Sequence, residues 1–160
     1  MIPQQAAPSH AQSHAQRDLF SAYSLDTLIS GAARLRPQGV ALSDRSTSVP
    51  FDLLAGQATA LARLLTDCGL RPGERLLLTG GAEVSLVIAI VAALRGRFEP
   101  ALAPLDLDAG ELAAYARAID AAALAELLRQ NAPAFCVVER VGARPGEGAT
   151  GAFSFGHSFG

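Results

Sequence analysis

Lysine is missing from the sequence. All thirteen basic residues in this chain of 160 residues are arginines. An ε-amine is needed for the lysine grip of a P-loop, for Schiff-base catalysis and for a lysine that steadies an acyl phosphate. Tryptophan is also absent, and two tyrosines and seven phenylalanines leave few aromatic surfaces on which bases or sugars can stack. The composition therefore excludes lysine-dependent mechanisms within this chain.

The net charge is small, and cysteines and long apolar runs are few. Thirteen basic against fifteen acidic residues give a charge of −2, so no nucleic-acid partner is expected. Cys68 and Cys136 form no disulfide framework or metal motif and are expected to be core thiols. The most apolar run, Val84–Leu94, has 11 residues, short of the roughly 20 that span a bilayer. Without a secretory signal or a membrane span, the chain is predicted to be a cytoplasmic domain.

Both ends of the sequence differ from its middle. Residues 1–23 are rich in Gln, Ala, Ser and His and are predicted to be a disordered leader. His10 and His14 have the i, i+4 spacing of a helical metal pair, but no further ligand lies near them in the sequence. Residues 142–160 are mostly glycine and small residues and are predicted to be a Gly-rich loop or truncated tail. A single folded domain is therefore expected over residues 24–141.

Helix signals begin at Ser24. This residue is expected to cap a helix that ends before Pro37, and Asp52 to cap a second helix that ends near Asp67. Gly69 follows the second helix where a left-handed C-terminal residue is favoured. The apolar positions of the first helix, expected to face the core, are Leu25, Leu28, Ile29, Ala32 and Leu35. Those of the second helix are Leu54, Ala58, Leu61 and Leu65.

Strand signals alternate with further helices. The predicted strands are residues 40–42, 48–51, 75–79, 99–103 and, last, 135–138. Residues 83–95 predict a deeply placed apolar helix, and Asp108 with Glu111 predicts a capping box that starts another helix. Residues 121–130 are expected to continue that helix or to open a second one. This alternation predicts an α/β fold with a mostly parallel sheet flanked by helices.

The order and spacing of several segments carry a family resemblance. An Ala/Leu-rich helix runs into Gly69–Arg75 and the strand Leu76–Leu78, and a helix ending at Ala92–Gly96 precedes a proline-containing strand and then Pro104–Leu105. Over residues 24–140 this series resembles the N-terminal region of the adenylate-forming (AMP-binding) acyl-CoA synthetase/ligase superfamily. The resemblance implies the N-terminal α/β subdomain of that family. Arg97–Glu99 replaces the usual small, apolar lead into the next strand, so the resemblance does not indicate which acid is the substrate.

The resemblance also implies a chemistry. Members of the family activate a carboxylic acid with ATP and Mg²⁺ to an acyl-adenylate and pass the acyl group to a thiol, usually coenzyme A. Their phosphate loop and a C-terminal segment each carry a lysine, which this chain lacks. Thr150–Gly151 is too short a match to be the phosphate loop. We therefore expect this chain to be a scaffold portion that is inactive alone. Its implied partner is the remainder of the ligase, in cis or in trans.

Two other interpretations stay open. Gly156–Gly160 matches the G-x-S-x-G elbow of α/β-hydrolases and thioesterases, with Ser158 as nucleophile, but no Asp and His follow it. The chain is alternatively a stand-alone, non-catalytic binding module. Gly80–Gly81 is interpreted as a plain turn and not as a loop that binds phosphate. Asp106 and Asp108 resemble a pair of catalytic carboxylates, but Asp108 is explained as a helix cap. No residue is assigned as catalytic, cofactor-binding or metal-binding.

Overall fold

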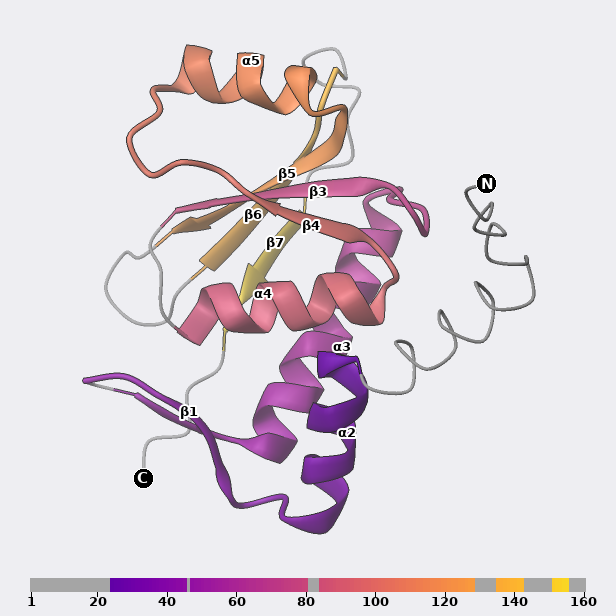
Figure 1. The fold of residues 1–160 in the computed structure, drawn as a ribbon, viewed down its shortest axis with the longest axis vertical. Coiled ribbons are helices and arrows are strands. Elements are labelled where there is room, and N and C mark those ends of the chain that lie inside the picture. Colours follow the sequence, from indigo (N-terminus) through magenta and orange to yellow (C-terminus); the bar gives the residue numbers. More distant parts are fainter. Residues whose placement is uncertain (1–23, 46, 81–83, 129–134, 143–150, 156–160) are drawn as a thin grey trace, which may run out of the picture.

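The computed structural model describes residues 24–45, 47–80, 84–128, 135–142 and 151–155. The elements are α2 (Leu25–Leu35), β1 (Val40–Ser43), β2 (Ser48–Pro50), α3 (Phe51–Asp67), β3 (Arg75–Gly80), α4 (Val84–Arg95), β4 (Glu99–Leu102), α5 (Ala109–Ala118), β5 (Ala121–Leu128), β6 (Phe135–Arg140) and β7 (Gly151–Ser154). Helix α5 lies on one side of the main sheet, and α3 and α4 lie on the other (Figure 1). The predicted α/β architecture is confirmed.

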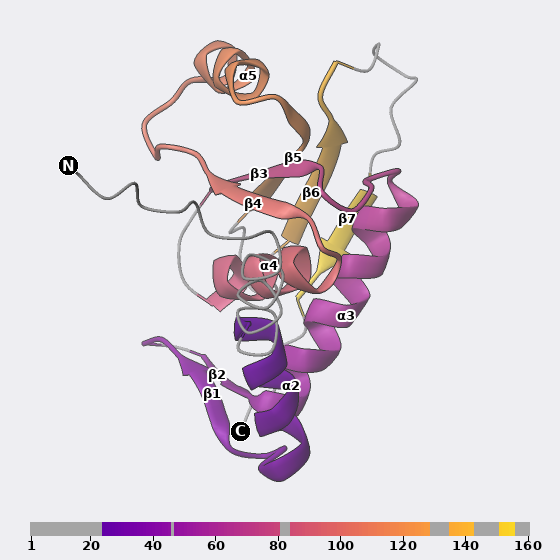
Figure 2. The same cartoon turned by 45° about the vertical axis from the view of Figure 1, so that its right-hand side comes forward.

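The main sheet is mixed. Its strand order is β4-β3-β5-β6-β7, in which β3 pairs in parallel with β4 and β5, whereas β6 pairs antiparallel with β5 and β7. The predicted parallel arrangement thus holds for three neighbouring strands, and the antiparallel strands extend the sheet at one edge. The antiparallel hairpin β1–β2 lies with α2 at the far end of α3 from the sheet (Figure 2).

Strand β3 carries the core on both faces of the sheet. Leu76 and Leu78 belong to the cluster shared with α3 and α4, whereas Leu77 belongs to the cluster under α5. All three side chains are at most 1% exposed, which confirms the prediction of a strand buried on both faces. Burial of a leucine contributes about 1.5–3 kcal/mol, so this strand anchors both layers.

Three predicted helix ends are confirmed. The Ser24 hydroxyl accepts a hydrogen bond from the Thr27 amide at the start of α2. At α5, Asp108 and Glu111 form the full capping box, each side chain accepting from the other residue's backbone N–H at 2.8 and 2.9 Å. Gly69 follows α3 with φ +89°, a conformation that glycine adopts without strain.

Two predictions about helices are wrong. Helix α3 begins one residue before Asp52, with Pro50 in extended conformation at the N-cap position. Asp52 lies in the first turn, where its negative charge still favours the helix. Residues 121–128 form strand β5 and no helix, because Asp120 turns the chain out of α5 with φ +55° and the strand is then held between β3 and β6.

The described part of the predicted Gly-rich tail contains a strand. Residues Gly151–Ser154 form β7, paired with β6, so residues 135–138 are not the last strand. Gly151 is required at its position because a Cβ there would lie 2.7 Å from the Cys68 Sγ atom, just after α3. This close approach lets α3 pack against the antiparallel edge of the sheet.

Helix α2 does not bury its predicted apolar stripe. Only Ile29 is buried, whereas Leu25, Leu28 and Leu35 are 44%, 58% and 84% exposed. The side of α2 that faces the molecule instead carries the polar residues Asp26 and Ser30, which bind Arg95 of α4. The polar contacts with Arg95, a largely buried side chain, therefore favour an orientation of α2 that differs from the one its leucine pattern predicts.

Candidate functional site

The carboxyl ends of β3 and β4 lie at one edge of the molecule. Strand β3 ends at Gly80, whose φ is +107° and whose Cβ, if present, would lie 2.3 Å from the Leu127 carbonyl oxygen. Glycine is therefore needed for the close pairing of β3 with β5 at this point. In open α/β sheets ligands bind outside the carboxyl ends of parallel strands, which makes this edge the first candidate for a site.

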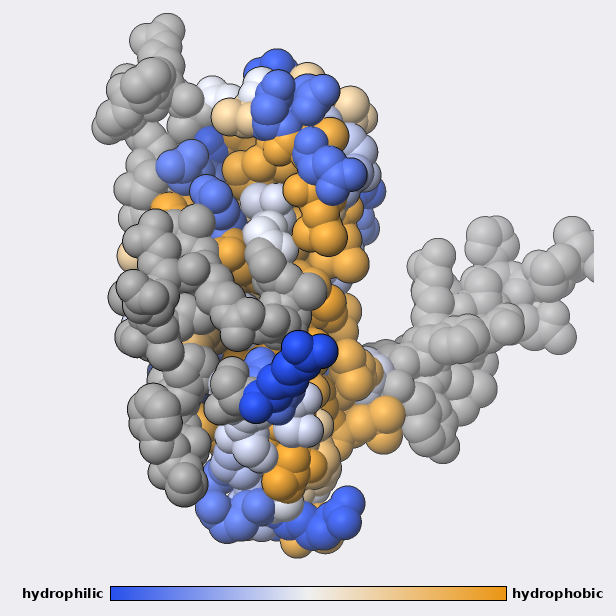
Figure 3. Space-filling model, turned by 90° about the vertical axis from the view of Figure 1, so that its left-hand side faces the viewer, coloured by the Kyte–Doolittle hydropathy of each residue, from blue (hydrophilic) through white to orange (hydrophobic). Residues whose placement is uncertain are grey.

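Two exposed leucines lie at this edge. Leu102, the last residue of β4, is 54% exposed, and Leu105 in the following turn is 76% exposed. A hollow of about 260 Å³ lies between the hairpin and the start of α4 and is lined by Leu42, Ser43, Asp44, Val84, Leu86 and Val87. Figure 3 shows hydrophobic residues running along one side of the molecule.

The outer side of β4 is poor in backbone donors. The amides of Glu99 and Ala103 bond to β3 and its flanks, at Glu74 and Leu78. Because N–H groups alternate between the two sides of a strand, residues 100, 102 and 104 face outward. Positions 100 and 104 are prolines, so Leu102 supplies the one outward N–H of this edge. Proline at an edge discourages the addition of another strand.

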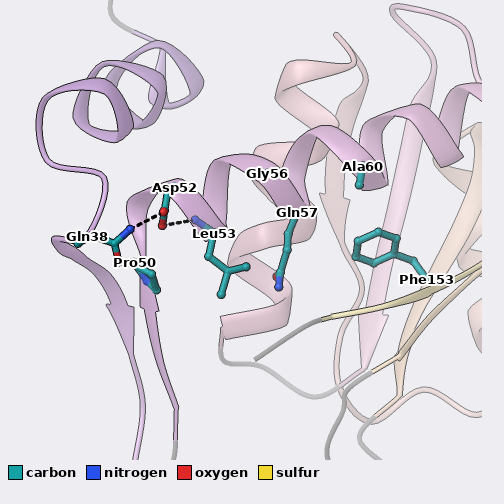
Figure 4. A pocket seen from close by; sticks show the side chains of 8 residues that line it. All are labelled: Gln38, Pro50, Asp52, Leu53, Gly56, Gln57, Ala60 and Phe153. Carbon is teal, nitrogen blue, oxygen red and sulfur yellow. Dashed lines mark hydrogen bonds between the residues drawn. The ribbon is translucent and has the colours of Figure 1, made fainter. Parts of the chain in front are cut away.

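A second hollow lies beside the N-terminal half of α3. Its volume is about 470 Å³ and it is lined by Gln38, Pro50, Asp52, Leu53, Gly56, Gln57, Ala60 and Phe153 (Figure 4). The Gln38 amide donates to Asp52 at 2.7 Å, and Asp52 also accepts from the Leu53 amide. The one carboxylate of this lining accepts from these two donors, and the rest of the lining is apolar apart from the side chains of Gln38 and Gln57.

Arg95 connects the three helices on one side of the sheet. Its guanidinium forms a 2.6 Å ion pair with Asp26 of α2 and also donates to Ser30 at 3.0 Å. Towards α3 it donates to the Ala55 carbonyl and the Thr59 hydroxyl, both at 2.6 Å. Sequence reasoning missed this cluster. The available signal was the single charged residue in an otherwise apolar helix, since a charge in such a place requires partners.

The two cysteine thiols are buried, and their surroundings disfavour the thiolate form. Cys68 and Cys136 are 4% and 0% exposed, which confirms that they are core residues. Desolvation, with a smaller contribution from the charge of Cys68, raises the pKa of Cys136 to about 12. Burial, followed by the negative charge of Asp67, also raises the pKa of Cys68. A nucleophilic cysteine requires a lowered pKa, so neither thiol has the environment of a catalytic one.

Several residues singled out in the sequence lie outside the described residues. These are His10, His14, Gly81, Thr150, Ser158 and the remainder of the G-x-S-x-G match. Asp106 is exposed, and Asp108 acts as the helix cap. Within the described ranges, no group of three or more His, Cys, Asp or Glu residues could hold a metal ion. In the same ranges no helix has the length and apolar character needed to cross a membrane.

Known protein structures share this fold. A benzoate CoA ligase from Burkholderia xenovorans LB400 matches 64% of this chain at 24% identity with a TM-score of 0.58. The o-succinylbenzoate coenzyme A synthetase (MenE) of Bacillus subtilis, solved in complex with ATP and magnesium ion, matches 62% at 19% identity with a TM-score of 0.57. The structure of IdnL1 matches 82% at 21% identity with a TM-score of 0.60. No family model matches the sequence, and no curated protein matches it either.

These likenesses concern the fold. The chain has the fold found in adenylate-forming acid–CoA ligases, as the resemblance over residues 24–140 predicted. It spans 21% of the benzoate CoA ligase, 27% of the Bacillus subtilis synthetase and 30% of IdnL1. The sequence contains no lysine, so this chain supplies neither of the two lysines that the resemblance implies for the nucleotide chemistry.

Proposed function

We propose that this chain is the N-terminal scaffold portion of an adenylate-forming acid–CoA ligase and forms no acyl-adenylate by itself. The observation that carries the proposal is the mismatch in coverage. The shared fold accounts for up to 82% of this chain but for 30% or less of the proteins compared above. In this proposal ATP, Mg²⁺ and coenzyme A are bound by the remainder of the ligase, joined in cis or supplied in trans.

The chemistry of the described residues supports a structural role. Arg95 and the capping residues join or stabilise helices, and the two hollows described above are lined mainly by apolar side chains. A phosphoryl or adenylyl transfer needs positioned cations to balance the charge that develops on phosphate oxygens. The cations for which the structure gives interactions bind carboxylates, hydroxyls or carbonyls of the fold itself.

The hydrolase alternative is not favoured. The structural neighbours include ligases and give it no support, and Ser158 lies outside the described residues. A thioesterase would hydrolyse a thioester in the absence of ATP, which separates it from the ligase proposal. Release of free thiol from an acyl-CoA test substrate by this chain, lost in Ser158→Ala, would restore the alternative.

The proposal is tested by ATP–pyrophosphate exchange with a panel of carboxylic acids. The chain of 160 residues is assayed alone and together with the polypeptide encoded immediately downstream, in frame or separately. We expect no exchange by the chain alone and acid-dependent exchange by the combination. Exchange by the chain alone would contradict the scaffold role. A combination that binds no ATP and activates no acid would contradict the ligase assignment.

A further inference from the structure

We infer that residues 19–23 pack along an exposed apolar stripe of helix α2. The stripe consists of Leu25, Leu28 and Leu35 and is called the leucine stripe. The inference is independent of the proposed function, because it concerns an interaction within the chain of 160 residues. It assigns a partner to a helix face that the described residues leave uncovered, and of the predicted leader it leaves only residues 1–18 without an assigned contact.

The leucine stripe occupies one side of α2. At 3.6 residues per turn its three side chains fall within an arc of about 80°, and the half-buried Ala32 falls inside the same arc. Asp26 and Ser30, which bind Arg95, point in other directions around the helix. Apolar residues at this spacing are typical of a helix face that is covered by another part of the protein.

The sequence places a cluster of apolar residues directly before this helix. Residues 3–18 contain no Leu, Ile, Val, Met, Phe or Tyr, whereas Leu19, Phe20 and Tyr23 all fall within the five residues that precede Ser24. A segment with this composition gains free energy when it buries its side chains against an apolar surface. The leucine stripe is the apolar surface to which the segment is joined.

The cap of α2 determines how the segment enters the helix. Ser24 is the N-cap, with an extended backbone and with its hydroxyl accepting from the Thr27 amide. Tyr23 is therefore the residue before the cap, and Leu28 is the fourth residue of the helix. These are the two positions of a hydrophobic staple, a contact that fixes the entry angle of the chain. Because Leu28 belongs to the leucine stripe, the staple directs the segment towards it.

The length of the segment matches the length of the stripe. From Leu25 to Leu35 the helix rises about 15 Å, and five extended residues span about 17 Å. A tethered segment loses little translational and rotational freedom when it binds, whereas a second copy of the chain loses much more. A helix of 11 residues is also too small for the roughly 800 Å² per partner of a stable interface. The stripe therefore favours residues 19–23 over a second copy.

The exposed leucines of the main sheet are a less favourable place for this segment. Leu102 and Leu105 are comparably exposed, but they lie at the end of β4. Helix α2 lies at the far end of α3 from that sheet (Figure 2). Since residues 19–23 are joined to α2 through Ser24, they meet the leucine stripe first.

Chymotrypsin cleavage tests the contact in the intact chain. The protease cuts after Phe20, whose peptide bond lies outside α2. Leu28→Ser removes the central side chain of the leucine stripe, and the matched control Leu105→Ser removes an exposed leucine elsewhere. A free peptide of residues 12–27 gives the cleavage rate of the uncovered segment. Mass spectrometry measures the rate of cleavage after Phe20, and circular dichroism checks that both variants are folded.

We expect cleavage after Phe20 to be at least about tenfold slower in the unchanged chain than in the peptide, at every chain concentration. Leu28→Ser raises the rate close to that of the peptide, whereas Leu105→Ser leaves it unchanged. Cleavage of the unchanged chain at the peptide's rate would overturn the inference, as would equal rates in the two variants. Protection that grows with chain concentration would assign the stripe to a second copy, and protection that arises only with the downstream polypeptide would assign it to that polypeptide. Either result would also overturn the inference.

Discussion

Arg95 offers the sharpest test of how the three helices on one side of the sheet are joined. Replacement by methionine keeps an unbranched side chain of similar length but removes all five guanidinium N–H donors. Arg95→Met abolishes the hydrogen bonds to Asp26 and Ser30 of α2 and those to the Ala55 carbonyl and Thr59 of α3. The substitution therefore removes the polar connection from α4 to both neighbouring helices.

The magnitude follows from the exposure of the ion pair. Removal of one partner of a fully buried pair costs about 3–5 kcal/mol, whereas exposed pairs contribute about 0–1 kcal/mol. The Arg95 and Asp26 side chains are 19% and 25% exposed, which places this pair between the two cases. We expect Arg95→Met to lower the free energy of unfolding by about 2–3 kcal/mol. The corresponding fall in Tm is about 5–10 °C for a domain of this size.

Urea unfolding followed by circular dichroism measures this effect. Arg34→Met is the matched control because Arg34 is exposed in the last turn of α2, and it should change stability by less than about 0.5 kcal/mol. In a double-mutant cycle, Asp26→Asn should cost less in the Arg95→Met background than in the natural protein, because the carboxylate no longer has its partner. Equal destabilisation by Arg95→Met and Arg34→Met would refute the connecting role of Arg95.

Two further predictions concern Gly80 and Cys136. Gly80→Ala should destabilise the protein by about 2 kcal/mol or more, because a methyl group at this position, with φ at +107°, would lie 2.3 Å from the β5 backbone. The control Gly31→Ala, in helix α2, has open space around the new methyl group and should stabilise the protein by up to about 1 kcal/mol. Similar Tm values for the two variants would contradict the close strand pairing. Because burial raises the pKa of Cys136 from 9.0 to about 12, the unfolded state loses its thiol proton first as pH rises, so the free energy of unfolding should fall between these pH values by about 1.4 kcal/mol per pH unit. Cys136→Ala should reduce this slope, measured by urea unfolding at fixed pH steps, and an unchanged slope would show that the thiol is not shielded.

The sequence alone determined the elements whose signals are local. Ser24 and the pair Asp108 and Glu111 specify helix starts because their side chains bond to amides within the same turn. The apolar run of β3 specifies a strand buried on both faces, since no amphipathic alternative exists for it. The order of these segments was sufficient to indicate the fold of adenylate-forming ligases.

Only the tertiary structure decided the features that depend on distant partners. Residues 121–128 favour a helix by composition, but pairing with β3 and β6 makes them a strand, since backbone bonds on both sides outweigh an intrinsic helix preference. The leucines of α2 predict a core-facing stripe, but of that stripe only Ile29 is buried, and Asp26, one turn before it, forms the ion pair with Arg95. The exposure of Leu102 and Leu105 could not be read from the sequence either, because it depends on which elements end beside them.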